Sequence, residues 1–509
     1  MTFGIVDLIA FVGFIAFVIG VSLYASRKEE TGEDYFLAGR GLTWWLIGFS
    51  LIASNISTEH FVGMAGRGFE LGLAIASYEW MAAITLVLVA FFFLPKFLRA
   101  GIYTMPEYLE YRYNTTARTI MAAFMMLAYV FVALATVLYS GALALEAIFG
   151  LDTVLGIWLI GLLAGFYTVY GGLKAVVWTD LLQGAALLLG GLLVTVLGFQ
   201  ALGGVDVFFA QAGDKLHTVL PWDHPEMPWV AVFIGGLWIP NLFYWGLNQF
   251  ITQRTLGARS LEEGQKGIML AALLKLLIPF VIVFPGIMAA MLYPQEVTQA
   301  DQAYPVLIRE LLPAGLRGVM LAALFGAVMS SLDSMLNSAA TIFTIDLYQR
   351  HWKKGQATPR ELVTIGRVAT AAFVLFGCLW APIVGRTGSV FQYIQMFWGF
   401  ISPGITAAFL FGLFSKRTPP EAAIGAMLLG IPVYGLLLWK LPHVAFLHHM
   451  MITFLVLAAF MWIVTKLRPL PEPPKMPDAP PIPMETSPRL RWMGLGIVGL
   501  TALLYLLFW

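Results

Sequence analysis

Long blocks of apolar residues recur along this chain of 509 residues and limit it to few folds. A helix needs about 20 predominantly apolar residues to cross the hydrocarbon core of a bilayer. Only 12% of the residues are charged, whereas soluble proteins carry about 25%. The sequence therefore predicts an all-α integral membrane protein. We expect about 14 transmembrane helices, at residues 5–25, 41–66, 70–95, 118–148, 153–171, 175–201, 228–252, 267–293, 317–347, 363–385, 388–414, 421–440, 446–465 and 492–509.

The distribution of basic residues predicts the orientation of the chain. No basic residue precedes the apolar block 5–25, and no small-residue cleavage site follows it, so we interpret it as a retained span and not a signal peptide. If the N-terminus lies outside, most of the 30 Lys and Arg residues fall in inside loops, as the positive-inside rule requires. We therefore expect a multi-pass protein of a bacterial-type cell inner membrane, with both termini outside.

Several classes of function are not expected. The net charge of +1 provides no basic field for nucleic acid, and the single cysteine, Cys378, excludes an internal disulfide and any cysteine-rich metal site. The chain has no GxxxxGK[ST] motif, so an ATP-driven pump is not expected. Residues 469–488 are proline-rich and are expected to form an extended tether before the last span. We predict no enzyme activity and no obligatory protein partner.

Ionisable residues inside the predicted spans are candidates for function, because a charge in a membrane is costly unless it is paired or faces water. Lys275 lies between AALL and LLIPF, too deep for its ammonium group to reach the surface. It must face a polar cavity or pair with a carboxylate such as Glu79. A purely structural ion pair between the two is the alternative.

Two spans carry dense groups of small polar residues. The segment SNIST in span 41–66 is bracketed by apolar stretches, and a helix break there would free carbonyl groups near Ala53 and Ile56 as cation ligands. The segment AVMSSLDSMLNS in span 317–347 repeats hydroxyl and carboxylate groups at one-turn spacing. Oxygen-only ligands suit hard cations. Plain helix–helix packing is the alternative interpretation of either segment.

Six stretches resemble the sodium/solute symporter family, in particular its sodium–glucose cotransporter branch with the bacterial sodium/galactose member. They are LIASNIS-EHFVGMAG, GLAIASYEWM, YGGLKAVVWTDLLQ, LFYWGLNQFITQRTL, SSL-SMLNSA-TIFT-D-Y and FQYIQ-F-G-ISPG, and the similarity runs from about 35 to 465. The resemblance implies a LeuT-type fold with a 5+5 inverted repeat, one extra N-terminal helix and three extra C-terminal helices. It also implies breaks near 53–57 and 241–249.

The resemblance implies five regions in the chain. They are 1–40 with the N-terminal extra helix and first cytoplasmic loop, 41–201 as the first inverted repeat, 202–227 as an extracellular loop, 228–416 as the second inverted repeat, and 417–509 with the C-terminal helices and the linker 469–488.

The resemblance also implies a set of site residues. The sugar site would contain Asn55, His60, Glu79, Asn241, Lys275 and Gln395. Met64, Tyr78 and Phe391 would form the outer gate, with Tyr244 as the inner gate. Sodium would bind the carbonyls of Ala53, Ile56 and Ala327 and the hydroxyls of Ser330 and Ser331. The chain departs from the galactose member at His60, Ala82 and Asp333, where that member has glutamine, serine and alanine.

The aspartate at position 333 raises the expectation of a second sodium site. Some family members hold a second ion with side-chain oxygens at this turn, and the matching set here is Asp180, Ser330, Asp333 and Ser334. A cation would relieve the repulsion between two nearby carboxylates. The alternative is that Asp333 faces cytoplasmic water or pairs with a base such as Arg254.

The function implied is secondary active transport, with inward sodium movement driving uptake of a hexose such as glucose or galactose by alternating access. The alternative substrates are myo-inositol, sialic acid or another small polar solute. A channel or sensor would need a continuous pore or a signalling domain, and no such domain is evident. Glu59 and Glu79 do not indicate a membrane glycosidase, because nothing places them across a water-accessible bond.

Overall fold

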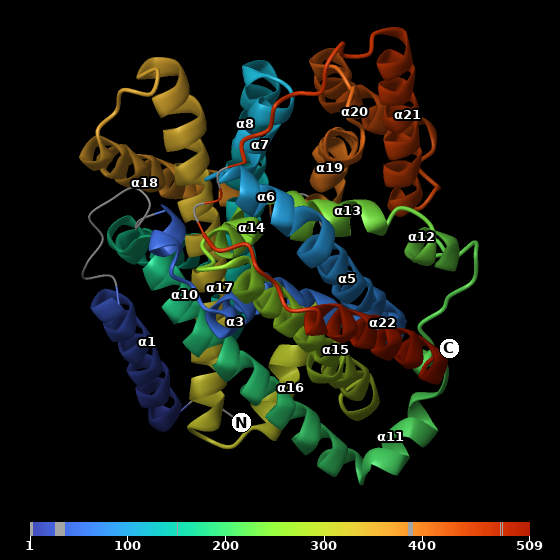
Figure 1. Cartoon of the computed structure of the whole chain (residues 1–509). Helices are drawn as coiled ribbons and strands as arrows, with labels where there is room; N and C mark the ends of the chain where they lie inside the picture. Colours follow the sequence, from blue (N-terminus) through green and yellow to red (C-terminus); the bar gives the residue numbers. More distant parts are fainter. Residues whose placement is uncertain (1–3, 26–35, 150, 385–389, 479, 481) are drawn as a thin grey trace.

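The computed structural model describes residues 4–25, 36–149, 151–384, 390–478, 480 and 482–509. Regular structure in these ranges is helical, apart from one isolated bridge between Leu42 and Ala258 (Figure 1). The α-helices are α1 (Ile5–Ala25), α3 (Trp44–Asn55), α4 (Ala65–Leu71), α5 (Ser77–Leu88), α6 (Leu94–Ala100), α7 (Met105–Arg112), α8 (Thr115–Ala128), α9 (Ala135–Phe149), α10 (Thr153–Leu202), α11 (Val205–Ala212), α12 (Trp229–Phe233), α13 (Trp238–Leu242), α14 (Gln249–Leu256), α15 (Leu261–Leu292), α16 (Ala303–Leu311), α17 (Leu316–Thr341), α18 (Pro359–Val384), α19 (Val390–Phe414), α20 (Pro420–Lys440), α21 (Phe446–Leu467) and α22 (Arg489–Leu507).

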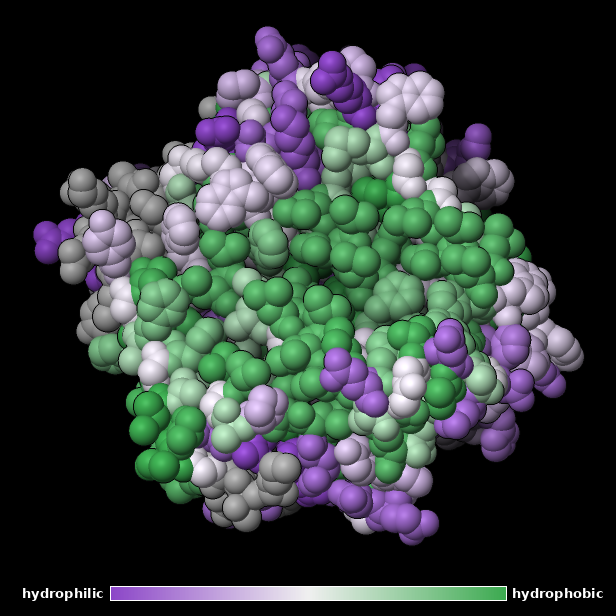
Figure 2. All heavy atoms as spheres, turned by 90° about the horizontal axis from the view of Figure 1, so that it is seen from below, coloured by the Kyte–Doolittle hydropathy of each residue, from purple (hydrophilic) through white to green (hydrophobic). Residues whose placement is uncertain are grey.

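The helices confirm the all-α membrane architecture. In the described part of the chain, 11 helices are long and apolar enough to cross a membrane, and two shorter apolar helices lie at Ile5–Val21 and Thr153–Phe166. These coincide with every predicted span except 41–66, which the structure divides between α3 and α4. A broad hydrophobic band covers the face seen in Figure 2, with hydrophilic residues above and below it. Such a band is what a lipid-facing surface requires.

Two of the helices are interrupted in the middle of the bundle. After α3 ends at Asn55, Ile56 has an extended backbone (φ −77°, ψ 96°), and a wide helical turn resumes at Glu59–Met64. After α13 and the turn Phe243–Leu247, Asn248 is extended (φ −82°, ψ 122°) before α14 begins. Both interruptions confirm the breaks predicted near 53–57 and 241–249.

The single helix α10 runs through the predicted spans 153–171 and 175–201 over 50 residues, and its apolar stretches Thr153–Phe166 and Val176–Leu202 correspond to the two spans. A straight helix of this length would measure about 75 Å at 1.5 Å per residue, more than twice the hydrocarbon core. The YGGLK segment keeps helical backbone in spite of its two glycines. Composition alone therefore predicts a loop between residues 171 and 175, where the backbone stays helical.

Close contact between α3 and α15 positions the functional side chains. Gly48 and Gly267 face each other across this contact, and a Cβ atom on Gly48 would lie 2.9 Å from the Gly267 carbonyl oxygen. A Cβ atom on Gly267 would lie 2.9 Å from the Trp44 carbonyl oxygen. Small residues let membrane helices approach closely. The approach brings Lys275, two turns after Gly267, close to the break that follows Asn55.

The proline-rich segment is extended, as predicted, and lies against the bundle. The described residues between α21 and α22 contain no helix, and in Figure 1 this segment crosses the bundle beside α6. The Leu470 amide donates to the Arg417 carbonyl at 2.9 Å, and the Leu261 amide donates to the Pro483 carbonyl at 3.0 Å. Ile482 is buried. We call the described residues between 469 and 488 the strap.

Candidate functional site: a cavity between two broken helices

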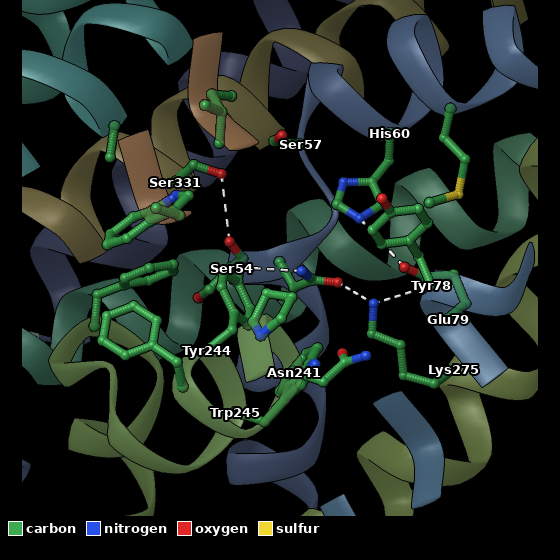
Figure 3. Close-up of a pocket in the computed structure, with 18 of the residues that line it drawn as sticks. Ser54, Ser57, His60, Tyr78, Glu79, Asn241, Tyr244, Trp245, Lys275 and Ser331 are labelled. Carbon is green, nitrogen blue, oxygen red and sulfur yellow. Dashed lines mark hydrogen bonds and ion pairs between the residues drawn. The ribbon is translucent and has the colours of Figure 1, made fainter. Parts of the chain in front are cut away.

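A cavity of about 170 Å³ lies where the two helix breaks face each other (Figure 3). Residues from both breaks, α5, α15 and α17 form its walls. The lining residues are Ser54, Asn55, Ser57, His60, Met64, Tyr78, Glu79, Ala133, Leu237, Pro240, Asn241, Phe243, Tyr244, Trp245, Phe250, Lys275, Ser331, Met335, Ile394 and Trp398. Five of the six predicted sugar-site residues are therefore in one place.

Lys275 is the centre of a buried polar network in this cavity. Its ammonium group donates to the Glu79 carboxylate and to the side-chain carbonyl of Asn55. The Lys275 and Glu79 side chains are only 1% and 4% exposed. The pairing that the sequence predicted for Lys275 is confirmed, and an ion pair offsets part of the cost of burying either charge alone.

His60 and Tyr244 extend the network on either side. The His60 Nε2 atom lies 3.5 Å from the second Glu79 oxygen, and the Asn55 side-chain amide donates to the Tyr244 hydroxyl at 3.0 Å. Figure 3 shows Tyr244 and Lys275 reaching the cavity from different elements. The chain of contacts from His60 to Tyr244 therefore joins the first helix break to the second.

Asn241 lines the cavity, and its side-chain amide donates to the Leu237 carbonyl at 3.1 Å. That bond leaves its oxygen available as an acceptor. Met64 and Tyr78, the predicted outer gate, also line the cavity. Gln395 and Phe391 fall on α19, but their side chains lie outside the described residues.

The sequence reasoning missed an aromatic wall. The Lys275 ammonium lies 4.9 Å from the centre of the Trp245 ring, and Trp398 also lines the cavity. A cation is attracted to the face of an indole. The signal was present in FYWGLNQ, where Trp245 directly follows Tyr244.

The residues of the predicted sodium site lie next to the first break. The last carbonyl groups of a helix have no partner in that helix, and α3 ends at Asn55 in the middle of the bundle. The Ser331 hydroxyl on α17 lies 3.5 Å from the Ser54 carbonyl oxygen. Ala53, Ile56, Ala327, Ser330 and Ser331 are all buried. One hydroxyl of α17 therefore lies close to a carbonyl group at the end of α3.

Asp180 joins α10 to three other helices near this region. Its carboxylate accepts hydrogen bonds from Ser54 at 3.0 Å, and from Ser50 and Ser330. The Arg254 guanidinium on α14 lies 3.0 Å from the same carboxylate and also donates to Ser334. Ser50, Ser54 and Arg254 are members of this cluster that the sequence reasoning did not assign to it.

Asp333 lies elsewhere on α17. The Thr168 hydroxyl on α10 donates to its carboxylate at 2.5 Å. Asp333 is 0% exposed and so does not face cytoplasmic water in this structure, and Arg254 pairs with Asp180. Asp180, Ser330 and Ser334 share one cluster, and Asp333 is anchored beside it.

Comparison with known proteins gives the family. The model of the family described as Sodium:solute symporter family matches residues 35–430. The chain belongs to this family. Its members are transporters, so this symporter is a sodium-coupled solute carrier and not an enzyme, as the sequence predicted.

Relatives of this symporter have names that include sugars and polyols. The sodium/glucose cotransporter of Vibrio parahaemolyticus is 43% identical over 99% of this chain and 98% of its own length. The human sodium/myo-inositol cotransporter 2 is 36% identical, with 84% of this chain and 68% of its own length covered.

Solved structures give the same fold. A substrate-bound, outward-open sodium-coupled sialic acid symporter superposes with a TM-score of 0.83 and 25% identity, covering 91% of this chain and 98% of that one. The nucleobase-cation symporter Mhp1 superposes with a TM-score of 0.55 at 16% identity, covering 85% of this chain and 95% of its own, which shows likeness of fold alone.

Proposed function

We propose that this symporter couples inward sodium movement to uptake of a sugar, a hexose such as glucose or galactose, by alternating access. The observation that carries the proposal is the buried network of Lys275, Glu79 and Asn55 in a cavity with aromatic walls. The name of the Vibrio relative supports the same substrate class.

The chemistry of the cavity suits a hexose, whose hydroxyl groups both donate and accept. Glu79 accepts hydrogen bonds, Lys275 donates them, and the amide of Asn241 does both. A sugar entering the cavity can take over the contacts that Lys275 now makes within the protein. Tyr244 and Trp245 offer aromatic faces to the apolar face of a pyranose ring. Gln395 is proposed as a further amide contact.

Tyr244 is proposed as the inner gate, with Met64, Tyr78 and Phe391 as the outer gate. The hydrogen bond from Asn55 to the Tyr244 hydroxyl supports the inner assignment, because it ties the two helix breaks together. Opening toward the inside would have to release this bond. Alternating access then amounts to exchanging one closed side for the other around a fixed site.

Sodium is proposed to bind where α3 ends, held by the carbonyls of Ala53, Ile56 and Ala327 and the hydroxyls of Ser330 and Ser331. The buried position of these residues and the short approach of Ser331 to Ser54 support this. Because Asn55 contacts Lys275 directly, a cation that orders the end of α3 would also order the sugar site. This contact provides a route for coupling.

The second candidate substrate is myo-inositol, favoured by the names of relatives that are 36% identical. It presents the same hydroxyl chemistry as a hexose. Sialic acid is less suited, because Glu79 is already a carboxylate in the cavity and would repel a second one. A substrate panel must therefore include all three.

The finer architecture is part of the proposal. It has 14 transmembrane helices in a LeuT-type 5+5 inverted repeat, with repeats at 41–201 and 228–416, an extracellular loop at 202–227, an additional region at 1–40 and C-terminal helices at 417–509. The membrane is proposed to be the cell inner membrane, with both termini outside.

Binding by the purified protein tests the substrate class. Trp245 and Trp398 line the cavity, so sugar binding should change tryptophan fluorescence in sodium chloride and not in choline chloride. Glucose, galactose, myo-inositol and sialic acid are titrated in turn. Sodium-dependent binding of sialic acid alone would reject the sugar proposal.

A further inference from the structure

A second cavity, of about 230 Å³, lies away from the transport site at one end of the bundle. Its walls come from α6, α7, the end of α19 and residues 473–477 of the strap. By the positive-inside prediction, this end faces the cytoplasm. Four basic residues line the cavity, Lys96, Arg99, Arg112 and Lys416, and no acidic residue among the described ones does. We call it the basic pocket.

The charge of Arg112 is buried and held by neutral groups. Arg112 is 3% exposed, and its guanidinium donates to the carbonyls of Gly412, Ser415 and Thr418 at 3.0, 2.7 and 3.1 Å. Carbonyl oxygens orient a guanidinium without cancelling its charge. Burial lowers the pKa of Arg112 from its ordinary value.

The other cations of the pocket are also poorly compensated. Lys96 donates to the Leu413 carbonyl at 2.6 Å, and within the described residues neither Lys96 nor Lys416 has a carboxylate at ion-pair distance. Arg99 lies 3.5 Å from Asp478, but both side chains are mostly exposed, and such surface pairs contribute little. Up to four positive charges therefore face one weakly held carboxylate.

We propose that the basic pocket binds the phosphate group of an anionic ligand. A phosphomonoester carries a charge of about −1.5 to −2 at neutral pH and has three acceptor oxygens. Arginine matches such a group with a rigid fork of donors. Arg112 has five N–H groups, of which the three carbonyls leave two. A carboxylate ligand would bring only one negative charge to this cluster.

Two sources of phosphate can reach this end of the protein: a soluble phosphorylated compound and the headgroup of an anionic phospholipid. In either case the ligand would contact α6, the end of α19 and the strap together. The Leu470 amide of the strap already donates to the Arg417 carbonyl, just after α19. A ligand in the pocket would add a second connection, between the strap and the helices α6 and α19. The site is separate from the proposed sugar and sodium sites, so its test does not depend on them.

The test measures thermal unfolding of the full-length protein. In a zwitterionic detergent, the Tm is compared in sodium phosphate, sodium acetate and sodium chloride at equal sodium activity and ionic strength. In vesicles without added phosphate, phosphatidylcholine alone is compared with phosphatidylcholine containing phosphatidic acid.

The test variant is the double substitution Arg99→Gln with Lys416→Gln, since both side chains are exposed. Arg112→Lys keeps the charge and removes the fork. Arg360→Gln, an exposed arginine on α18 outside the pocket, is the matched control.

We expect phosphate or phosphatidic acid to raise the Tm of the unmodified protein and of Arg360→Gln. The double variant should bind phosphate at least tenfold more weakly, because it loses two of the four cations that line the pocket. A response to inorganic phosphate identifies a soluble source, and a response to phosphatidic acid alone identifies the lipid. The proposal is overturned if neither raises the Tm, if acetate acts as strongly as phosphate, or if the double variant responds like the unmodified protein.

Discussion

Lys275 on α15 and Glu79 on α5 form an ion pair inside the bundle, across 196 residues of sequence. Both side chains are almost completely buried, and the Lys275 ammonium also bonds Asn55 at the break after α3. The pair lines a cavity and lies beside the Trp245 ring, which a role in packing alone would not require. Its position makes the pair the connection between the proposed sugar cavity and the helix that carries the proposed sodium ligands.

Lys275→Ala should abolish sugar transport while folded protein remains in the membrane. The substitution removes a donor to the sugar and leaves the Glu79 carboxylate buried and unpaired, which is strongly unfavourable. Labelled-sugar uptake and the amount of folded protein are measured together. Lys275→Met combined with Glu79→Gln, which buries no charge, separates loss of function from loss of fold.

Lys266→Ala is the matched control for this prediction. Lys266 lies on the same helix and pairs with Glu262 at 2.8 Å, but it is exposed at the end of the helix. Its removal should leave sugar affinity unchanged. Normal sugar affinity in Lys275→Ala would contradict the assignment of Lys275 to the sugar site.

Tyr244→Phe should retain transport and Tyr244→Ala should lose it. Phenylalanine keeps the ring that covers the sugar and loses only the hydrogen bond from Asn55, a bond that contributes about 1 kcal/mol. Alanine removes the ring itself and opens the inner side of the cavity. Initial uptake rates in proteoliposomes measure both variants. Normal transport by Tyr244→Ala would place the inner gate elsewhere.

The sequence was most informative at residues whose burial in a membrane is energetically costly. Lys275 and Glu79 could be paired because a lysine that deep in a membrane needs a partner. The segment around SNIST predicted the first break because its small polar residues are too many for one packing face. The resemblance supplied the second break and most of the remaining site residues.

Contacts between distant helices could not be read from the sequence in the same way. Asp180 and Asp333 both looked like members of one cation site, but their neighbours depend on how α10 and α14 pack against α17. Arg254 contacts Asp180 only because the fold brings α14 and α10 together, and no sequence pattern indicates that pair. Likewise, the aromatic face of Trp245 toward Lys275 depends on the exact course of the chain before Asn248.

Arg254→Gln should destabilise the protein by about 3 kcal/mol or more, because it leaves the Asp180 carboxylate buried without its cation. Adding Asp180→Asn to Arg254→Gln should recover much of the loss, since no buried charge then remains. Thermal unfolding of the single and double variants measures the coupling. Equal Tm values for Arg254→Gln and the unmodified protein would show that the pair is not structural.

Asp333→Ala tests the second sodium site that the sequence predicts, made of Asp180, Ser330, Asp333 and Ser334. Two sodium ions per sugar would give a sodium Hill coefficient above one and steeper accumulation of sugar against its gradient. Asp333→Ala should reduce the coupling to one sodium per sugar without eliminating uptake. Charge-to-flux measurement of the unmodified protein decides the point. A ratio of one to one would reject the second site and leave only the site next to Ala53 and Ser331.

Uptake of labelled sugars into proteoliposomes containing only this protein tests the central claim most directly. Glucose, galactose, myo-inositol and sialic acid are each supplied with an inward sodium gradient, with an equal inward potassium gradient, and with sodium equal on both sides. We predict saturable accumulation of a hexose above its external concentration only with the sodium gradient, and loss of accumulation when the gradient is collapsed. Accumulation that is equal with potassium, or flux that does not saturate and never exceeds equilibration, would contradict a sodium-driven sugar symporter.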